Sequence, residues 1–152
     1  MGIEIERKFL AVGDAWRAAL AVYFSQGYLS RNKARTVRIR VADEHAYLTI
    51  KGATTGASRA EFEYDIPLAD ARELLALCDG PLIEKYRRKI THEGMVWEVD
   101  EFLGENQGLV VAEIELESES QTFTKPDWLG AEVTHDQRYY NSNLSAHPFS
   151  QW

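Results

Sequence analysis

Charged residues occupy alternate positions in several predicted strands of this 152-residue chain. The first example is the segment EIERK, in which Glu4, Glu6 and Lys8 are separated by single residues. Because neighbouring side chains of a β-strand point to opposite faces of the sheet, this spacing places all three charged groups on one face. The segment therefore predicts a strand with a charged face, and the later strands decide whether the whole sheet shares it.

The same alternation recurs along the chain, with charged residues at one parity and mainly apolar residues at the other. The charged rows are Glu4-Glu6-Lys8, Arg38-Arg40, Lys51, Glu61-Glu63, Lys85-Arg87, Glu98-Asp100 and Glu113-Glu115. The apolar rows are Val37-Ile39-Val41, Leu48-Ile50, Phe62-Tyr64, Val99 and Ala112-Ile114-Leu116. We expect the apolar face to pack outward against helices, and the charged face to look away from them.

Turn and helix signals divide the chain into short elements. Alternating arms at 36–41 and 46–51 flank the polar turn ADEH and predict a hairpin. Leucines spaced along 69–80 predict a helix, and THDQRYYN predicts a short C-terminal helix with Thr134 as its N-cap. Roughly eight strands with one or two helices predict an α+β fold built on an antiparallel sheet that curls or closes.

Two arrangements of such a sheet are open: a flat sheet with its charged face in water, or a barrel whose charged face lines the interior. The charged rows are sorted into acidic pairs and basic pairs, and adjacent like charges cost free energy. Ions inside a barrel also lose hydration worth several kcal/mol each unless partners or ligands compensate. The sorted rows favour the barrel, with an interior that binds both a polyanion and a cation.

The residue types in these rows indicate the chemistry. Clustered carboxylates without patterned His or Cys supply hard oxygen ligands, which suit Mg²⁺ or Mn²⁺. Arg and Lys pairs donate hydrogen bonds to phosphate oxygens. The rows together predict a metal-dependent site for a compact phosphate chain, at which phosphoryl transfer takes place.

Composition limits the other possibilities. The 17 Lys and Arg against 24 Asp and Glu give a net charge of −7, which argues against a generic nucleic-acid surface. The single Cys78 cannot form an intrachain disulfide, and no apolar run is long enough to span a bilayer. We expect one domain over 1–152 in a cytoplasmic monomer or homodimer, with no nucleic-acid or membrane partner.

EIERK resembles the ExExK signature of the CYTH superfamily, the triphosphate tunnel metalloenzymes. The later rows TVRIR, LTIKG, AEFEYDI, EKYRRK, WEVDEF and VVAEIELES occur in that family's order. The resemblance covers nearly the whole chain and is nearest to the short bacterial inorganic triphosphatases. It implies an eight-stranded antiparallel barrel that forms a tunnel, with helices outside and a divalent ion beside a triphosphate.

The resemblance also implies roles for individual residues. It makes metal ligands of Glu4, Glu6, Asp100, Glu113 and Glu115. It makes phosphate-binding residues of Lys8, Arg38, Arg40, Lys51, Lys85, Arg87 and Arg138, the last near the family's C-terminal plug. It places Lys8, Tyr28, Glu61 and Glu63 in the catalytic group. Glu61, Glu63 and Glu98 share the inward parity, and we expect them either to bind a second ion or to orient the Arg and Lys side chains. Tyr28 is an unusual proton acceptor, because an unperturbed phenol has a pKa near 10.

The resulting expectation is metal-dependent hydrolysis of inorganic triphosphate to pyrophosphate and phosphate, by in-line attack of water. Alternatives within enzymes are a class IV adenylyl cyclase, which uses the ribose 3′-hydroxyl of ATP as the attacking group, and a thiamine or nucleoside triphosphatase. An alternative of another kind is a polyphosphate-binding module without turnover. The acidic rows disfavour the binding module, because a pure binder has little need of metal-activated water.

Overall fold

A computed structural model describes residues 2–152 of the chain. Its strands are β1 (Ile3–Ala11), β2 (Ala21–Asn32), β3 (Arg35–Ala42), β4 (His45–Lys51), β5 (Ser58–Asp65), β6 (Asp79–His92), β7 (Met95–Phe102), β8 (Val110–Glu115) and β9 (Leu129–Glu132). Its helices are α1 (Leu68–Leu77) and α2 (Asn141–Ala146). Short 3₁₀ turns are η1 (Ala15–Ala18), η2 (Gly104–Asn106), η3 (Gln137–Tyr139) and η4 (Phe149–Gln151).

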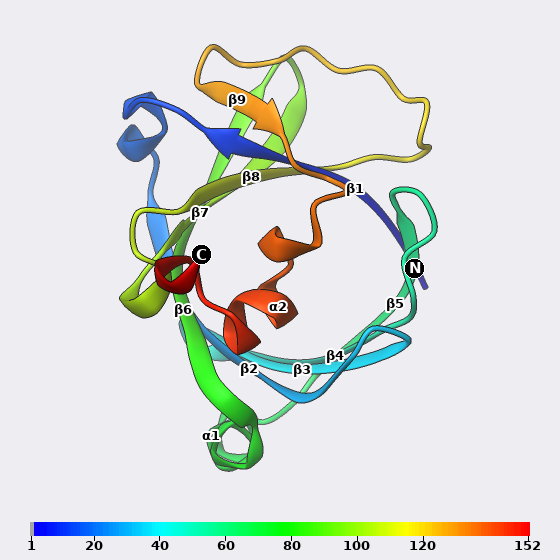
Figure 1. Ribbon diagram of the computed structural model, residues 1–152, viewed down its shortest axis with the longest axis vertical. Coiled ribbons are helices and arrows are strands. Elements are labelled where there is room, and N and C mark those ends of the chain that lie inside the picture. Colours follow the sequence, from blue (N-terminus) through cyan, green and yellow to red (C-terminus); the bar gives the residue numbers. More distant parts are fainter. Residues whose placement is uncertain (1) are drawn as a thin grey trace.

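The strands β1 to β8 form a closed antiparallel barrel (Figure 1). The sheet order is β5-β4-β3-β2-β6-β7-β8-β1, and β1 returns to β5 through the pairs Ile3↔Ala60 and Glu4↔Arg59. The later part of β1 pairs with β8, where Lys8 lies opposite Glu113. Strand β9 pairs with the last residues of β1 and extends the sheet there. The predicted barrel is confirmed, and the alternative of a flat open sheet is wrong.

Apolar residues of β1, β7 and β8 point out of the barrel and pack beneath other segments. Phe9, Trp97 and Ile114 form one core with Trp16 of η1, and Phe123 of the 116–128 connection packs against it. The rings of Phe9 and Trp97 meet edge to face with centroids 5.7 Å apart. These contacts fix the outward parity of the three strands, so their other parity faces the barrel interior.

Helix α1 covers the outside of β2, β3 and β4, as the apolar rows predicted. Its Ala71 packs against Ile39 and Ala46, and all three side chains are buried. The prediction does not extend to the neighbouring strand, because Phe62 and Tyr64 of β5 are 48% and 56% exposed. Helix α1 packs over β3 and its neighbours β2 and β4, and it leaves Phe62 and Tyr64 exposed.

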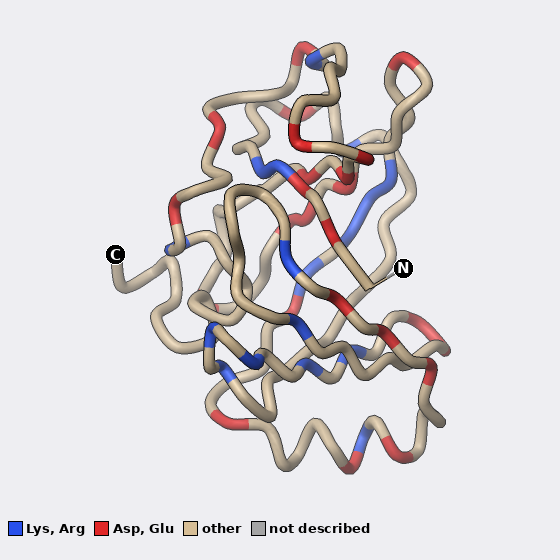
Figure 2. The backbone as a smooth tube through the Cα atoms, turned by 90° about the vertical axis from the view of Figure 1, so that its right-hand side faces the viewer, with Lys and Arg blue, Asp and Glu red and all other residues tan. Residues whose placement is uncertain are grey.

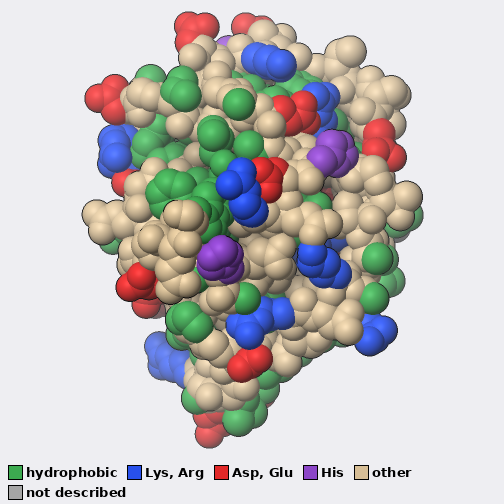
Figure 3. Space-filling view, viewed as in Figure 1, with side chains coloured by type: hydrophobic (Ala, Val, Ile, Leu, Met, Phe, Trp, Pro, Cys, Tyr) green, Lys and Arg blue, Asp and Glu red, His purple; other side chains and the backbone are tan. Residues whose placement is uncertain are grey.

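The C-terminal segment closes one end of the barrel. Figure 1 shows η3 and α2 inside the ring of strands, and Figure 3 shows atoms covering the middle of this end. Leu144 of α2 and Tyr139 of η3 pack against Ile83 and Val111 of the barrel wall. Helix α2 is therefore a plug, and not a second outer helix.

The predicted N-cap of the C-terminal helix is wrong. Thr134 is buried, and its hydroxyl accepts a hydrogen bond from the Lys8 backbone N–H at 3.0 Å and donates to Glu132 at 2.5 Å. The capping side chain belongs to Asp136, which accepts from the Arg138 N–H at the start of η3. Within residues 2–152, neither helix is long or apolar enough to cross a membrane.

Candidate active site

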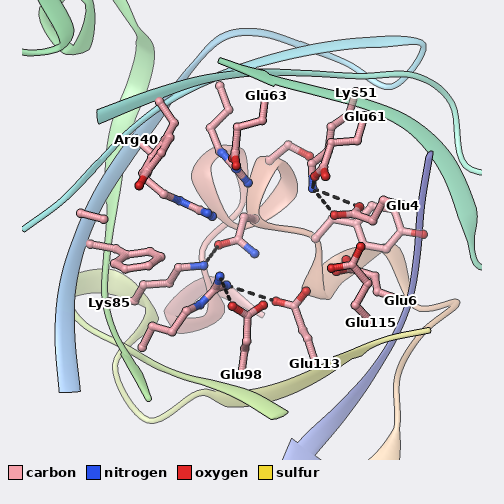
Figure 4. A pocket seen from close by; sticks show the side chains of 18 of the residues that line it. Glu4, Glu6, Arg40, Lys51, Glu61, Glu63, Lys85, Glu98, Glu113 and Glu115 are labelled. Atoms are coloured by element: carbon pink, nitrogen blue, oxygen red, sulfur yellow. Dashed lines mark hydrogen bonds and ion pairs between the residues drawn. The ribbon is translucent and has the colours of Figure 1, made fainter. Parts of the chain in front are cut away.

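The barrel encloses a cavity of about 720 Å³ whose walls carry both signs of charge (Figure 4). Figure 2 shows Lys, Arg, Asp and Glu following one another along the strands. The predicted site residues that line the cavity are Glu4, Glu6, Lys8, Tyr28, Arg38, Arg40, Lys51, Glu61, Glu63, Lys85, Arg87, Glu113 and Glu115. Glu98 also lines it. Asp100 and Arg138 do not.

Four cationic side chains, Arg38, Arg40, Lys85 and Arg87, gather on one side of the cavity, where β2 joins β3 to β6. Arg40 is buried, and its Nε donates to the neutral Gln26 Oε1 at 2.8 Å. Among the described residues, Arg40 makes no ion pair within 4.0 Å. Burial, with repulsion from Arg38 and Arg87, lowers the pKa of Arg40 to about 9. This concentration of buried positive charge favours an anion in the cavity.

Carboxylates and lysines are interleaved where β1 meets β8. The Lys8 ammonium donates to Glu6 and to Glu113, each at 2.9 Å. Burial and the nearby Glu113 carboxylate raise the pKa of Glu6 to about 7, despite the opposing attraction of Lys8. A second cation at this point would relieve the repulsion between the two carboxylates.

A similar arrangement joins β1 to β4 and β5. Lys51 donates to Glu4 at 3.1 Å, and Arg59 approaches the same carboxylate at 3.2 Å. Glu61 also lies against Glu4, and burial followed by this contact raises the pKa of Glu61 to about 7. Burial acts upward on Glu4 as well, but the attraction of Lys51 and a hydrogen bond from Glu61 lower its pKa to about 2. The two adjacent carboxyl groups thus have opposite pKa shifts, and a cation bound between them would relieve their repulsion.

The donor set fits a hard divalent cation, although its members are not gathered into one cluster. All the acidic ligands offered to the cavity are carboxylate oxygens, which Mg²⁺, Mn²⁺ and Ca²⁺ prefer. Within the described part of the chain, no three Asp, Glu, His or Cys side chains converge closely enough to enclose an ion. Glu4, Glu6 and Glu113 pair with Lys8 and Lys51, so these two ammonium groups compete with an ion for the carboxylates.

Asp100 has a different environment from the other predicted ligands. Its side chain is fully buried, with Lys85 at 2.7 Å and the Nε of Arg87 also at 2.7 Å. Despite its burial, these two cations hold the pKa of the Asp100 carboxyl below its usual range. Both oxygens are occupied by hydrogen bonds from the two cations, so the geometry favours a role in positioning them over metal ligation.

Arg138 lies outside the cavity. Its side chain is 58% exposed and pairs with Asp136 at 2.7 Å. Its guanidinium stacks on Trp152, 4.7 Å from the ring centroid. The segment that contains Arg138 does form the plug, but the residue faces solvent, and the geometry does not support the predicted phosphate contact.

Two other predicted catalytic residues lie near the cationic group. The Tyr28 hydroxyl is 3.5 Å from Gln26 Nε2, and burial raises the pKa of the phenol, so the phenolate that could accept a proton is scarcer at neutral pH. Glu63 accepts a hydrogen bond from the Thr49 hydroxyl at 3.0 Å and lies 3.5 Å from Arg38. With a side chain 44% exposed, Glu63 stands nearer to solvent than Glu61 does.

The site also involves residues that were not predicted, among them Arg59, Gln26 and Asn141. Arg59 lines the cavity and has the same strand parity as Glu61 and Glu63, so the alternation already indicated it. Gln26 and Asn141 connect the cationic group to the plug through a hydrogen bond of 3.1 Å. Uncharged amides give no signal in a charge pattern, and only the folded structure brings these two together.

Comparisons with known proteins agree with this geometry. A family model described as the CYTH domain matches residues 2–146. A curated inorganic triphosphatase of Acetivibrio thermocellus is 54% identical over 154 residues, which cover 100% of this chain and 99% of the relative. One of Nitrosomonas europaea is 35% identical over 147 residues, covering 93% and 96%. The crystal structure of the inorganic triphosphatase NE1496 superposes with a TM-score of 0.66 at 33% identity, covering 93% of each chain.

Proposed function

Because this chain belongs to the CYTH domain family, we propose that its cavity hydrolyses inorganic triphosphate to pyrophosphate and orthophosphate. The single observation that carries the proposal is the buried Arg40, whose guanidinium lines the cavity beside other cations and lacks a carboxylate partner among the described residues. A buried charge of this kind is costly unless a ligand neutralises it. A compact phosphate chain supplies several negative charges within one cavity.

The cationic side chains bind and align the phosphate chain in this proposal. Arg38, Arg40, Lys85 and Arg87 present their donors from one side, and Lys8 and Lys51 from the other. Guanidinium groups fit pairs of phosphate oxygens, and ammonium groups act as point charges. An extended triphosphate held between the two groups would have its terminal phosphorus fixed for in-line attack.

Triphosphatases of this family depend on a metal ion. We propose Mg²⁺ or Mn²⁺, held by Glu4, Glu6, Glu113 and Glu115, with Glu61 nearby. When bound, such an ion neutralises charge on the phosphate oxygens in the transition state. Carboxylates that held the ion would pair less strongly with Lys8 and Lys51, whose ammonium groups would then be available to donate to phosphate.

We assign the proton acceptor to Glu61. Its carboxylate lines the cavity, lies 3.3 Å from Lys51 and contacts Glu4, so it stands beside the carboxylates proposed to hold the ion. Tyr28 retains a role in shaping the wall of the cavity, and Asp100 in fixing the heads of Lys85 and Arg87. One CYTH domain over 1–152 accounts for all of these residues.

A substrate panel tests the proposal. Purified protein with Mg²⁺ or Mn²⁺ is incubated with tripolyphosphate, ATP or thiamine triphosphate, and products are followed by ³¹P NMR. We expect equimolar pyrophosphate and orthophosphate from tripolyphosphate, at a kcat/KM above that for the organic substrates. Cyclic AMP from ATP would instead show an adenylyl cyclase, and binding without any product would show a binding module.

A further inference from the structure

The plug carries a polar side chain that contacts the cationic group of the cavity. Asn141, the first residue of α2, lines the cavity together with Lys85 and Arg40. Its Oδ1 accepts hydrogen bonds from Lys85 Nζ at 2.9 Å and from Gln26 Nε2 at 3.1 Å. Gln26 is completely buried, and its Oε1 accepts from Arg40 Nε at 2.8 Å. Two amides thus join the plug to two cations.

The chemistry of the neighbours fixes the orientation of both amides. Arg40 has only donors, so the oxygen of Gln26 must face it, and the Gln26 NH₂ group must face Asn141. Lys85 also has only donors, and it therefore faces the same oxygen of Asn141. Neither amide can rotate by 180° without placing donor against donor at a buried contact.

This arrangement aims the Lys85 ammonium at the cavity. An ammonium has three N–H donors. One donates to Asp100 at 2.7 Å and a second to Asn141 at 2.9 Å. The third has no hydrogen-bond partner among the described residues, and the fully buried Lys85 side chain forms part of the cavity lining. An amide holds the ammonium without removing its charge, whereas a carboxylate in the same place would compete with an anionic ligand.

We propose that Asn141 is a positioning residue for phosphate binding, which acts by directing Lys85, and through Gln26 also Arg40, toward the bound phosphate chain. The inference rests on the proposed function and makes the plug part of the substrate site. It requires a neutral acceptor at position 141. The critical feature is the lack of charge on that acceptor, which a role confined to packing would not require.

The test substitutes Asn141 by Asp, which keeps the shape and adds one negative charge. The matched control is Asn143→Asp, because Asn143 lies on the same helix and donates to the Gln137 carbonyl instead of contacting the cations. Affinity for tripolyphosphate is measured by calorimetry in the presence of Ca²⁺. Turnover with Mg²⁺ gives KM and kcat, and melting curves report folding.

For Asn141→Asp we expect the Kd and KM for tripolyphosphate to rise at least about tenfold, the scale of one charge-assisted hydrogen bond, with a smaller change in kcat. Its melting temperature without ligand should equal or exceed that of the parent protein, because the new carboxylate pairs with Lys85. Asn143→Asp should leave Kd and KM within about twofold of the parent.

Equal Kd values for the two Asp variants would overturn the inference while leaving triphosphate hydrolysis intact. If Asn141→Asp fails to fold, Asn141→Ala decides the matter: it removes the acceptor, and an unchanged kcat/KM would overturn the inference equally. Failure of the parent protein to bind or hydrolyse tripolyphosphate would instead overturn the proposed function and this inference together.

Discussion

The ammonium of Lys85 lies 2.7 Å from the carboxylate of Asp100, and neither side chain is exposed to solvent. Asp100 also accepts two hydrogen bonds from Arg87, which pairs in addition with Glu98 at 3.2 Å and Glu113 at 3.7 Å. For Lys85, Asp100 is the one carboxylate partner within 4.0 Å among the described residues. Removing one partner of a buried pair leaves an uncompensated charge, which is costlier than losing a surface contact.

Asp100→Asn should therefore destabilise the fold. We expect the free energy of unfolding in urea to fall by about 3–5 kcal/mol, because the buried Lys85 loses its carboxylate partner and Arg87 loses one of its three. The matched control is Asp136→Asn, which breaks the exposed pair with Arg138 and should cost less than about 1 kcal/mol. Equal losses in the two variants would show that Asp100 is not a structural counterion.

Neighbouring cations on β1 should have different effects on activity. Lys8→Ala removes a cavity ammonium and should lower kcat/KM for tripolyphosphate at least about tenfold. Arg7 points outward, pairs with Glu132 at 2.6 Å and stacks on Phe123. Arg7→Ala should lower stability by about 1 kcal/mol and leave kcat/KM within about twofold of the parent. Steady-state kinetics with melting curves would expose a wrong strand register if both variants lost activity equally.

Glu6→Gln tests the metal ligands. The substitution keeps the size of the side chain and removes a hard oxygen anion, so turnover with Mn²⁺ should fall on the order of a hundredfold or more. The Glu6→Gln variant should still fold when EDTA removes the metal, because burial and the Glu113 carboxylate already disfavour the charged form of Glu6. Glu101→Gln, which alters an outer-face carboxylate paired with Arg17 and Arg88, serves as the control and should retain activity. Near-normal turnover by Glu6→Gln would remove Glu6 from the metal site.

The raised carboxyl pKa values predict how stability depends on pH without divalent ions. Glu6 and Glu61 each titrate near 7 in the fold, against 4.5 as the reference value. The free energy of unfolding that these two groups contribute is fully present below about pH 4.5 and is lost as the pH rises through 7. Melting temperatures in EDTA should thus fall between pH 5 and pH 7.5, and Glu61→Gln should reduce the slope. A slope unchanged in that variant would contradict the raised pKa of Glu61.

Lys85 gives the opposite trend at higher pH. Burial and repulsion from Arg87 and Arg40, against the pull of Asp100, lower the pKa of Lys85 to about 7 from 10.5. The free energy of unfolding that Lys85 contributes is present above about pH 10.5 and is lost as the pH falls through 7. The carboxyl trend is therefore best measured below pH 7.5, where the two contributions overlap least.

Strand parity predicted most of the cavity wall, because in a closed barrel one parity must face inward. The parity of a strand position does not, however, tell how deep within the barrel the side chain lies. Asp100 shares the inward parity of Glu98, but it lies deeper, beneath Lys85 and Arg87, where it is shielded from the cavity. Arg59 is also on the inward parity and could have been identified from the same alternation.

Other features depended on packing that a charge pattern does not encode. The plug follows β9 and meets the barrel through Leu144 and Tyr139, residues far in sequence from the wall they contact. Asn141 reaches Lys85 only because that packing places α2 within the barrel end. The exposed Phe62 and Tyr64 show the converse, since an apolar outer row does not guarantee a covering helix.

The most direct test of the account is the thermal stability of the protein with tripolyphosphate and Ca²⁺ together, compared with each alone and with orthophosphate plus Ca²⁺. A ligand at about 100 times its Kd stabilises the native state by roughly 2.7 kcal/mol. For a chain of this size, we expect the melting temperature to rise by about 5 °C or more with tripolyphosphate and Ca²⁺ together, and much less in the other conditions. Equal shifts for orthophosphate and tripolyphosphate would contradict the claim that this cavity recognises an extended phosphate chain.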